Sequence, residues 1–196
     1  MTFFAEIAQT SVIEFIAVAA GLIGVWYSKK LNILVFQIGI VNEVLLAYIF
    51  FDKQLYSNMV INLCYLAMSI FGWYHWKHPK KDEKTLPVKF LNTKGAVVAT
   101  ASCLAAFGIM TIISKHFSGN EMSVWDSFSA ACGLLGMMLT ALKKVENWIF
   151  YLIADIILIP ICITNELYFS GLQYLIYCII CFMAFFSWRK EALKNA

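Results

Sequence analysis

Seven apolar runs follow one another along the chain, each about as long as a membrane crossing. A transmembrane helix needs about 20 largely apolar residues, and the polar breaks between these runs leave no room for a soluble domain. We therefore predict an all-α integral membrane protein with seven transmembrane helices. The runs lie at 11–28, 31–51, 56–77, 95–115, 122–142, 147–164 and 168–188.

The composition is consistent with lipid as the solvent. Of the 196 residues, 61% are hydrophobic and 14% are charged, and the mean hydropathy is +0.74. An ordinary soluble domain has about 45–50% apolar and about 25% charged residues. A soluble domain with this surplus of apolar side chains would aggregate. A collagen, a disordered tail and a secreted disulfide scaffold are excluded as well.

The basic residues are divided unequally between the two sides of the predicted bundle. Alternate loops must lie on the same side, and one set of loops holds all but two of the 15 Lys and Arg residues. By the positive-inside rule the rich side is cytoplasmic, so we expect the N-terminus outside and the C-terminus inside. The rich side has Lys29, Lys30, Lys77, Lys80, Lys81, Lys84, Lys89, Lys94, Lys143, Lys144, Arg189, Lys190 and Lys194, and the other side has Lys53 and Lys115.

The cysteines and the first residues give no sign of a metal site or of a cleaved leader. Cys178 and Cys181 form the one Cys-x-x-Cys spacing, without a second pair or a neighbouring His, so we interpret the six cysteines as small buried apolar residues. No cofactor or metal is expected. The first residues lack a basic region and a cleavage site, so we expect them to be retained as part of the first helix.

The chain repeats itself at one constant spacing. Gly21 and Gly24 match Gly133 and Gly136, 112 positions later, and Trp76 matches Trp188 at the same spacing. Three crossings reverse the chain direction, so an inversion helix must separate two copies of equal orientation. This predicts a 3+1+3 parallel repeat, the arrangement of the SWEET sugar transporters, with a substrate site between the halves. The predicted divisions are a first repeat at 1–77, a basic cytoplasmic linker at 78–94, an inversion helix at 95–115, a second repeat at 116–188 and a cytoplasmic tail at 189–196.

Asp155 is the most informative polar residue within a predicted span. A carboxylate at mid-helix costs about 2.5–3.5 kcal/mol on insertion scales. Trp148, Tyr151 and Asp155 have the spacing of one helix face. Because no Lys or Arg lies in the interior of any predicted span, the acid needs a ligand, a proton or water as its partner. A cationic ligand would satisfy it.

Further polar residues lie along the predicted second, third and seventh helices. We interpret Asn58, Ser69 and Ser170 as hydrogen-bonding contacts between helices, whereas Glu43 and Asn62, like Asp155, favour a lined cavity. Asn42 belongs with this cavity group. The other residues of note on these predicted helices are Gln37, Tyr65, Gln173, Tyr174, Tyr177 and Cys181. We interpret Trp73, Trp76 and Trp188 as an interfacial aromatic belt, and the Lys-rich linker as a solvated topology signal.

Four short motifs together resemble the PnuC family of bacterial vitamin transporters, over nearly the whole chain from Glu14 to Trp188. The resemblance implies a SWEET-like bundle, usually a homotrimer, in the bacterial inner membrane. It also implies facilitated diffusion of nicotinamide riboside, thiamine (in PnuT) or riboflavin, with intracellular phosphorylation trapping the product. The motifs are Glu146-Asn147-Trp148 after Lys143-Lys144, Trp125-Asp126-Ser127, Leu55-Tyr56, and Gly72-Trp73-Tyr74-His75-Trp76.

The resemblance also assigns substrate-facing positions. Three residues depart from the pattern expected of nicotinamide riboside carriers: Asp155 replaces an Asn, Asn62 replaces a Gln, and Glu43 stands where a neutral residue is usual. A carboxylate can hold the aminopyrimidine and the positive charge of thiamine, so these exchanges favour thiamine over nicotinamide riboside. The predicted substrate-binding residues are Asn42, Glu43, Asn62, Tyr65, Trp148, Tyr151, Asp155, Gln173 and Tyr177.

The alternatives to a passive carrier are proton-coupled uptake, through Glu43 and Asp155, and a non-transporting membrane scaffold. The chain has no phosphate-binding loop, no Gly-x-Ser-x-Gly and no His-Glu-x-x-His, so an enzyme is not expected. The expected partners are the lipid bilayer, a small vitamin and further copies of the chain. No nucleic-acid partner is expected.

Overall fold

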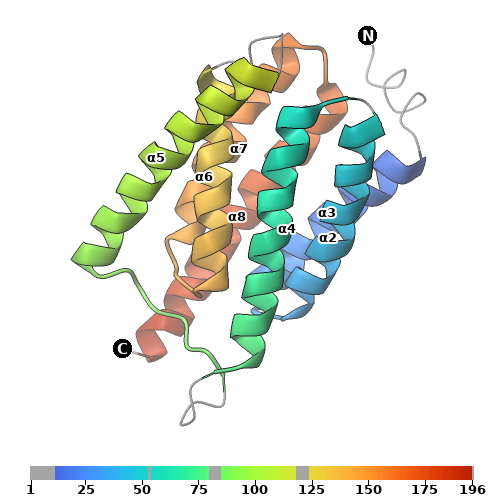
Figure 1. Ribbon diagram of the computed structural model, residues 1–196. Coiled ribbons are helices and arrows are strands. Elements are labelled where there is room, and N and C mark those ends of the chain that lie inside the picture. Colours follow the sequence, from blue (N-terminus) through green and yellow to red (C-terminus); the bar gives the residue numbers. More distant parts are fainter. Residues whose placement is uncertain (1–11, 53, 80–84, 118–123, 196) are drawn as a thin grey trace.

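The computed structural model describes residues 12–52, 54–79, 85–117 and 124–195. In these ranges seven α-helices run in alternating directions and pack into one bundle (Figure 1). Five of them, α3 and α5–α8, are long and apolar enough to cross a membrane. The protein is therefore an all-helical membrane protein. The helices are α2 (Val12–Lys29), α3 (Leu34–Asp52), α4 (Tyr56–Lys77), α5 (Thr93–Phe117), α6 (Val124–Ala141), α7 (Asn147–Thr164) and α8 (Tyr168–Lys194).

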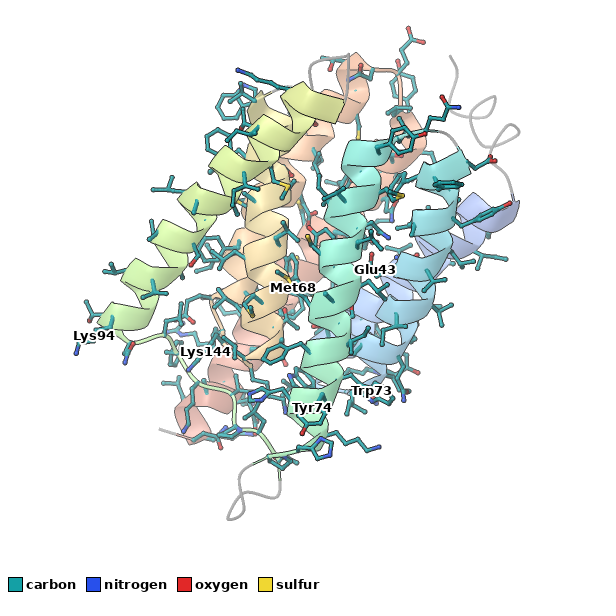
Figure 2. The ribbon with its side chains drawn as sticks, viewed as in Figure 1. Glu43, Met68, Trp73, Tyr74, Lys94 and Lys144 are labelled. Atoms are coloured by element: carbon teal, nitrogen blue, oxygen red, sulfur yellow. The ribbon has the colours of Figure 1, made fainter. Side chains whose placement is uncertain are left out.

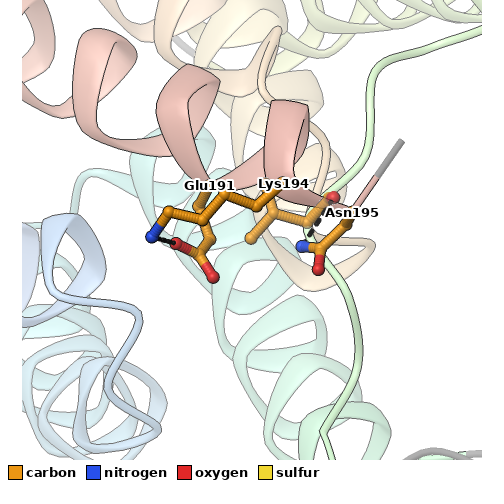
Figure 3. Close-up of polar contacts among 4 residues, drawn as sticks. Glu191, Lys194 and Asn195 are labelled. Carbon is orange, nitrogen blue, oxygen red and sulfur yellow. Dashed lines mark hydrogen bonds and ion pairs between the residues drawn. The ribbon is translucent and has the colours of Figure 1, made fainter.

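The helix bounds follow the predicted apolar runs closely, with one larger difference. The last helix was expected to end near residue 188, but α8 continues to Lys194. Helical structure therefore extends through most of the segment predicted as a tail, because a helix continues into water while its residues favour it. Figure 3 shows this end of α8, where Lys194 Nζ lies 2.9 Å from Glu191 Oε2.

Tight turns join the helices, and they recur along the chain. Leu31 and Lys143, which follow α2 and α6, have φ of 56° and 50°, and Gln54 and Glu166, which follow α3 and α7, have φ of 57° and 58°. Positive φ is uncommon for residues other than glycine. Both pairs are 112 positions apart, the spacing of the sequence repeat.

The helices pack as two sets of three with α5 to one side. We call α2–α4 the first unit and α6–α8 the second unit. Within each unit the middle helix, α3 or α7, packs against both of its neighbours, and between the units α2 packs on α8 and α4 on α6. Helix α5 packs mainly on α6, as seen at the edge of the bundle in Figure 1. We call the end of the bundle where 85–91 and the end of α8 lie the linker end.

Four aromatic rings pack together in the bundle interior at the linker end. We call Phe36, Trp76, Trp148 and Trp188 the aromatic layer. Phe36 packs edge-on against Trp76, with ring centroids 4.9 Å apart, and Trp148 packs edge-on against Trp188 at 5.5 Å. The centroids of Trp76 and Trp188 are 6.2 Å apart. The two edge-on pairs occupy positions 112 apart in the sequence.

The prediction that Trp76 and Trp188 belong to an interfacial belt is wrong. Their side chains are only 7% and 0% exposed. The Trp76 Nε1–H donates to the carbonyls of Thr140 (3.2 Å) and Ala141 (3.1 Å), and the Trp188 Nε1–H donates to that of Ser28 (3.1 Å). A buried indole N–H normally finds such an acceptor. Each tryptophan thus joins one unit to the last turn of the other.

The linker is also less solvated than expected. Among its described residues the side chains of Lys89 and Lys94 are exposed, but Val88 is buried and belongs to the same hydrophobic cluster as the aromatic layer. The backbone of Lys89 exchanges hydrogen bonds with the α6–α7 turn, donating to the Lys143 carbonyl (3.1 Å) and accepting from the Val145 N–H (3.2 Å). The Asn195 side chain donates to the Val88 carbonyl at 3.5 Å. Composition predicted the exposure of Lys89 and Lys94 and missed the burial of Val88.

Candidate functional site

Two cavities lie one above the other in the bundle. The cavity nearer the linker end measures about 250 Å³, and the far-side cavity measures about 400 Å³. Four residues line both of them: Glu43, Tyr65, Tyr151 and Asp155. We call these four the shared wall. Figure 2 shows Glu43 about half-way along the bundle, with Trp73, Tyr74, Lys94 and Lys144 towards the linker end.

The shared wall holds one carboxylate from each unit. Glu43 lies on α3 and Asp155 on α7, at positions 112 apart. Asp155 is 8% exposed and accepts a hydrogen bond from the Cys181 thiol, with sulfur and oxygen 3.7 Å apart. Among the described residues that line either cavity there is no Lys, Arg or His. Two carboxylates without a basic partner in a mostly apolar cavity favour a cationic ligand.

Two tyrosines reach across from one unit to a glycine of the other. A Cβ added at Gly133 would collide with the Tyr65 hydroxyl, and one added at Gly21 would collide with the Tyr177 hydroxyl. Both the glycines and the tyrosines are 112 positions apart. Glycine at these two positions therefore allows each hydroxyl to touch the opposite unit.

Hydrogen bonds within the second unit orient Tyr151. Its hydroxyl lies 3.4 Å from the Met137 sulfur and 3.3 Å from the Thr140 hydroxyl oxygen. Asn147 donates to that same Thr140 oxygen at 2.7 Å. The Trp148 and Tyr151 rings lie next to each other, with centroids 6.0 Å apart. Electron-rich faces beside two carboxylates suit a flat cation, which stacks on the rings while its charge meets the acids.

The comparisons with known proteins agree with a carrier. The nicotinamide mononucleotide transporter family matches residues 11–190. The chain belongs to this family, which includes PnuC. It is 25% identical to the nicotinamide riboside transporter PnuC of Escherichia coli, over 93% of this chain and 87% of that protein. The protein is therefore a multi-pass membrane transporter of a bacterial vitamin-transporter family, and not an enzyme.

Other relatives differ in the vitamin that their names state. The chain is 24% identical to the riboflavin/roseoflavin transporter RibM of Streptomyces davaonensis, over 67% of this chain and 63% of that protein. The fold matches the crystal structure of the vitamin B3 transporter PnuC with a TM-score of 0.74 and 20% identity, over 92% of this chain and 82% of that one. The predicted PnuC-type fold is thus confirmed.

The structure brings eight of the nine predicted site residues to the two cavities. Asn42, Trp148 and Tyr177 line the linker-side cavity, Asn62 lines the far-side cavity, and the shared wall accounts for the other four. Asn62 also donates to the Glu43 carbonyl.

Gln173 is the predicted residue that the structure places elsewhere. It lines a small apolar groove beside α2, and its amide donates to the Tyr177 hydroxyl at 2.8 Å. Gln173 therefore contacts the cavity through Tyr177.

Sequence reasoning missed several lining residues. Ser28, Gly39 and Thr140 line the linker-side cavity, and Ser69, expected as a contact between helices, lines it too. Small residues inside apolar runs carry little signal of their own. The repeat offered one, because Thr140 lies 112 positions after Ser28.

Proposed function

We propose that this PnuC-family transporter carries nicotinamide riboside, a flat pyridinium cation joined to a sugar. The shared wall carries the proposal, since it faces both cavities with two carboxylates and two tyrosine rings. A cation stacked on these rings gains from their quadrupoles and from the acids. Because the same four groups face each cavity, a ligand held there can be reached from either end of the bundle.

The named relatives support nicotinamide riboside more than thiamine, which the sequence pattern favoured. PnuC of Escherichia coli is a nicotinamide riboside transporter and RibM a riboflavin/roseoflavin transporter. Thiamine is the second candidate, because Asp155 and Glu43 can hold both its fixed charge and its amino group. Riboflavin has no fixed charge for these acids to hold.

The proposed arrangement is a 3+1+3 parallel repeat in which α5 inverts the chain between the two units. The recurring turns, the Tyr–Gly contacts and the tryptophan hydrogen bonds, all spaced by 112 positions, support it. Most of the described Lys and Arg residues lie at the linker end, so we propose that this end is cytoplasmic and the N-terminus outside. Transport would proceed by rocking one unit against the other around the shared wall, with intracellular phosphorylation trapping the product.

We also propose a homotrimer in the bacterial inner membrane, as the PnuC resemblance implies. Helix α5 packs mainly on α6 and leaves Val97, Val98 and Ile112 exposed, so it offers an apolar face to lipid or to a second copy. Light scattering of the purified protein, corrected for detergent, measures the number of copies.

Replacing the acids of the shared wall tests the proposed function. We expect Asp155→Asn and Glu43→Gln each to weaken nicotinamide riboside binding by about tenfold or more, since a charged contact contributes about 1.5–3 kcal/mol. Titration calorimetry or quenching of tryptophan fluorescence measures the affinity, with nicotinamide riboside, thiamine and riboflavin compared side by side in wild type and variants.

The matched control is Glu191→Gln, an acid of the α8 end whose partner is Lys194. This variant should bind as wild type does. Tighter binding of thiamine by the wild type would replace the first candidate with the second. Unchanged affinity in both acid variants would contradict the cation site altogether.

A further inference from the structure

The two units meet along two seams, and at the linker end the seams differ. One seam is the contact of α4 with α6, and the other is the contact of α2 with α8. Each has an indole bond at the linker end, from Trp76 to the last turn of α6 or from Trp188 to the last turn of α2. These two bonds are equivalent, so the remaining contacts decide which seam separates more easily.

The α4–α6 seam has a charged contact in addition to its indole bond. The Lys143 ammonium, in the turn after α6, lies 4.3 Å from the centroid of the Trp76 ring of α4. A cation over a tryptophan face is attracted by the ring quadrupole, most strongly where water is excluded, and both side chains are buried here. Separating α4 from α6 would therefore break this contact together with the indole bond.

The linker adds a second tie across the α4–α6 seam. The chain leaves α4, and the described part of the linker runs past the α6–α7 turn to α5 (Figure 1). The Lys89 backbone bonds this turn twice, at Lys143 and at Val145. The Leu91 N–H donates to the Glu146 carboxylate. Helix α5 then packs on α6 and also touches α4, so the chain itself holds the end of α4 against the second unit.

The contacts of the α2–α8 seam at the linker end are weaker. Beside the Trp188 indole bond, the Lys29 ammonium lies 3.7 Å from the Met183 sulfur, which is a weak acceptor, near the surface. The residue that corresponds to Lys143 is Leu31, whose side chain packs against the cluster around the aromatic layer. Apolar contacts of this kind can shift without leaving a buried charge unpaired.

The α2–α8 seam is also incompletely packed in its other half. An apolar groove of about 180 Å³ lies there between the two helices, and Phe15, Leu22, Phe169 and Leu172 line it. Side chains beside a void lack partner atoms on one side, so less dispersion energy is lost when the helices separate. Both halves of this seam therefore resist separation less than the α4–α6 seam does.

We propose that the α4–α6 seam is the hinge of the carrier and that the α2–α8 seam is the one that opens at the linker end. The proposal deepens the proposed function and rests on it, because it states where the rocking of the units takes place. Residues of all four seam helices line the linker-side cavity. Separation of α2 from α8 would connect this cavity to the linker end, while α4, the linker and α5 stay on α6.

Distances across the two seams test the hinge in the full-length protein without any ligand. One pair of spin labels is placed at Lys30 and Arg189, at the ends of α2 and α8. The other pair is placed at the equivalent positions, Leu142 and Lys77, at the ends of α6 and α4. Attachment through p-acetylphenylalanine leaves the native cysteines in place. Pulsed electron paramagnetic resonance in lipid nanodiscs gives the distance distribution of each pair.

Removing the two indole bonds in turn separates the seams. We expect Trp188→Phe to raise the population of long α2–α8 distances by about tenfold, as for the loss of one hydrogen bond, and to leave the α4–α6 distances as in wild type. The equivalent change, Trp76→Phe, should alter neither distribution, because the Lys143 contact and the linker remain.

The matched control is Trp26→Phe, a change near the same end of α2 at a side chain that is 41% exposed. It should alter neither distribution. The hinge is overturned if Trp188→Phe lengthens both distances, lengthens the α4–α6 distance alone, or changes neither. It is equally overturned if Trp76→Phe separates α4 from α6 to the same extent.

Added vitamin distinguishes the hinge from the proposed function. In the wild type, nicotinamide riboside should change the proportion of long α2–α8 distances and leave the α4–α6 distances unchanged. If neither nicotinamide riboside nor thiamine has an effect or enters proteoliposomes, the proposed function fails, while the response to Trp188→Phe still decides the hinge. If the vitamin enters but the α4–α6 distance is the one that changes, the function stands and the hinge is wrong.

Discussion

At the scale of single residues, Gly133 determines how closely Tyr65 approaches α6. A Cβ at this position would overlap the Tyr65 hydroxyl, so the ring, which forms part of the shared wall, would have to move. Overpacking of this kind costs about 1–3 kcal/mol. We expect Gly133→Ala to lower nicotinamide riboside uptake into proteoliposomes by about tenfold, together with a lower melting temperature.

Gly108 provides the matched control. No heavy atom lies within 4 Å of a Cβ added there. Gly108→Ala should therefore leave both uptake and melting temperature unchanged. Equal loss in the two variants would mean that helix flexibility, and not the Tyr65 contact, is what Gly133 provides.

Much of the site could be predicted residue by residue, because polar groups within apolar runs stand out. Asp155 and Asn62 were identifiable on that ground. The correspondence between Glu43 and Asp155 was present at the same spacing of 112, but the neighbouring pair, Asn42 and Ala154, does not match and obscured it. Ser28 and Thr140 were missed, since a hydroxyl at a helix end is compatible with many roles and only the spacing of 112 relates the two residues.

At the scale of elements, the linker and the α6–α7 turn pack together around Lys143. The Lys143 ammonium lies 4.3 Å from the centroid of the Trp76 ring and donates to the Leu86 carbonyl at 2.9 Å. Glu146 accepts from the Leu91 N–H at 3.0 Å on the other side of the turn. The equivalent positions of the first unit, Leu31 and Leu34, have no charge with which to bind a linker.

This packing predicts a pH-dependent stability. Burial lowers the pKa of Lys143 from 10.5 to about 8. Between these values the unfolded chain binds the proton and the folded protein has lost it, so the contribution of Lys143 to stability rises as pH rises from about 8 to 10.5. We expect the melting temperature of wild type, measured relative to Lys143→Met, to increase over this range.

Thermal unfolding in detergent, followed by tryptophan fluorescence at several pH values, measures this difference. Lys144→Met is the control, because the Lys144 side chain is more exposed in the same turn. The melting temperature of Lys144→Met should depend on pH in the same way as that of wild type. If the melting temperatures of wild type and Lys143→Met change with pH in parallel, Lys143 is not the cause of the pH-dependent stability.

The positions of the helices were predictable from hydropathy, but the burial of individual side chains on them was not. Apolar runs predicted the seven helices of the described residues, and the five that are long and apolar enough to cross a membrane satisfy their own backbone there. The same measure cannot tell a tryptophan at the membrane surface from one in the interior, and so Trp76 and Trp188 were misassigned. Nor could it show that Val88 is buried, because a single valine among lysines leaves the average polar.

At the scale of the whole molecule, the position of the acids is compatible with both passive and proton-coupled transport, and a transport measurement distinguishes the two. Glu43 and Asp155 face both cavities, so either could bind a cation or relay a proton. We expect a uniporter, in which the cation itself partners the acids. Labelled nicotinamide riboside should then exchange across proteoliposomes at the same rate with and without an imposed pH gradient.

A protonophore provides the check on this prediction. With the membrane potential held at zero by potassium and valinomycin, it should leave the exchange unchanged, and the vitamin should not exceed its external concentration in the absence of a kinase. Accumulation that follows the pH gradient and collapses with the protonophore would instead establish coupling through the acids.

The reciprocal tryptophan bonds have a further consequence. Trp76 of the first unit binds the end of α6, and Trp188 of the second unit binds the end of α2, so neither unit completes its own closure. Contacts exchanged in this way are characteristic of two-fold symmetric dimers, where each surface binds a copy of itself. Under the proposed repeat, one unit on its own would therefore have to pair with a second copy of itself to form both contacts.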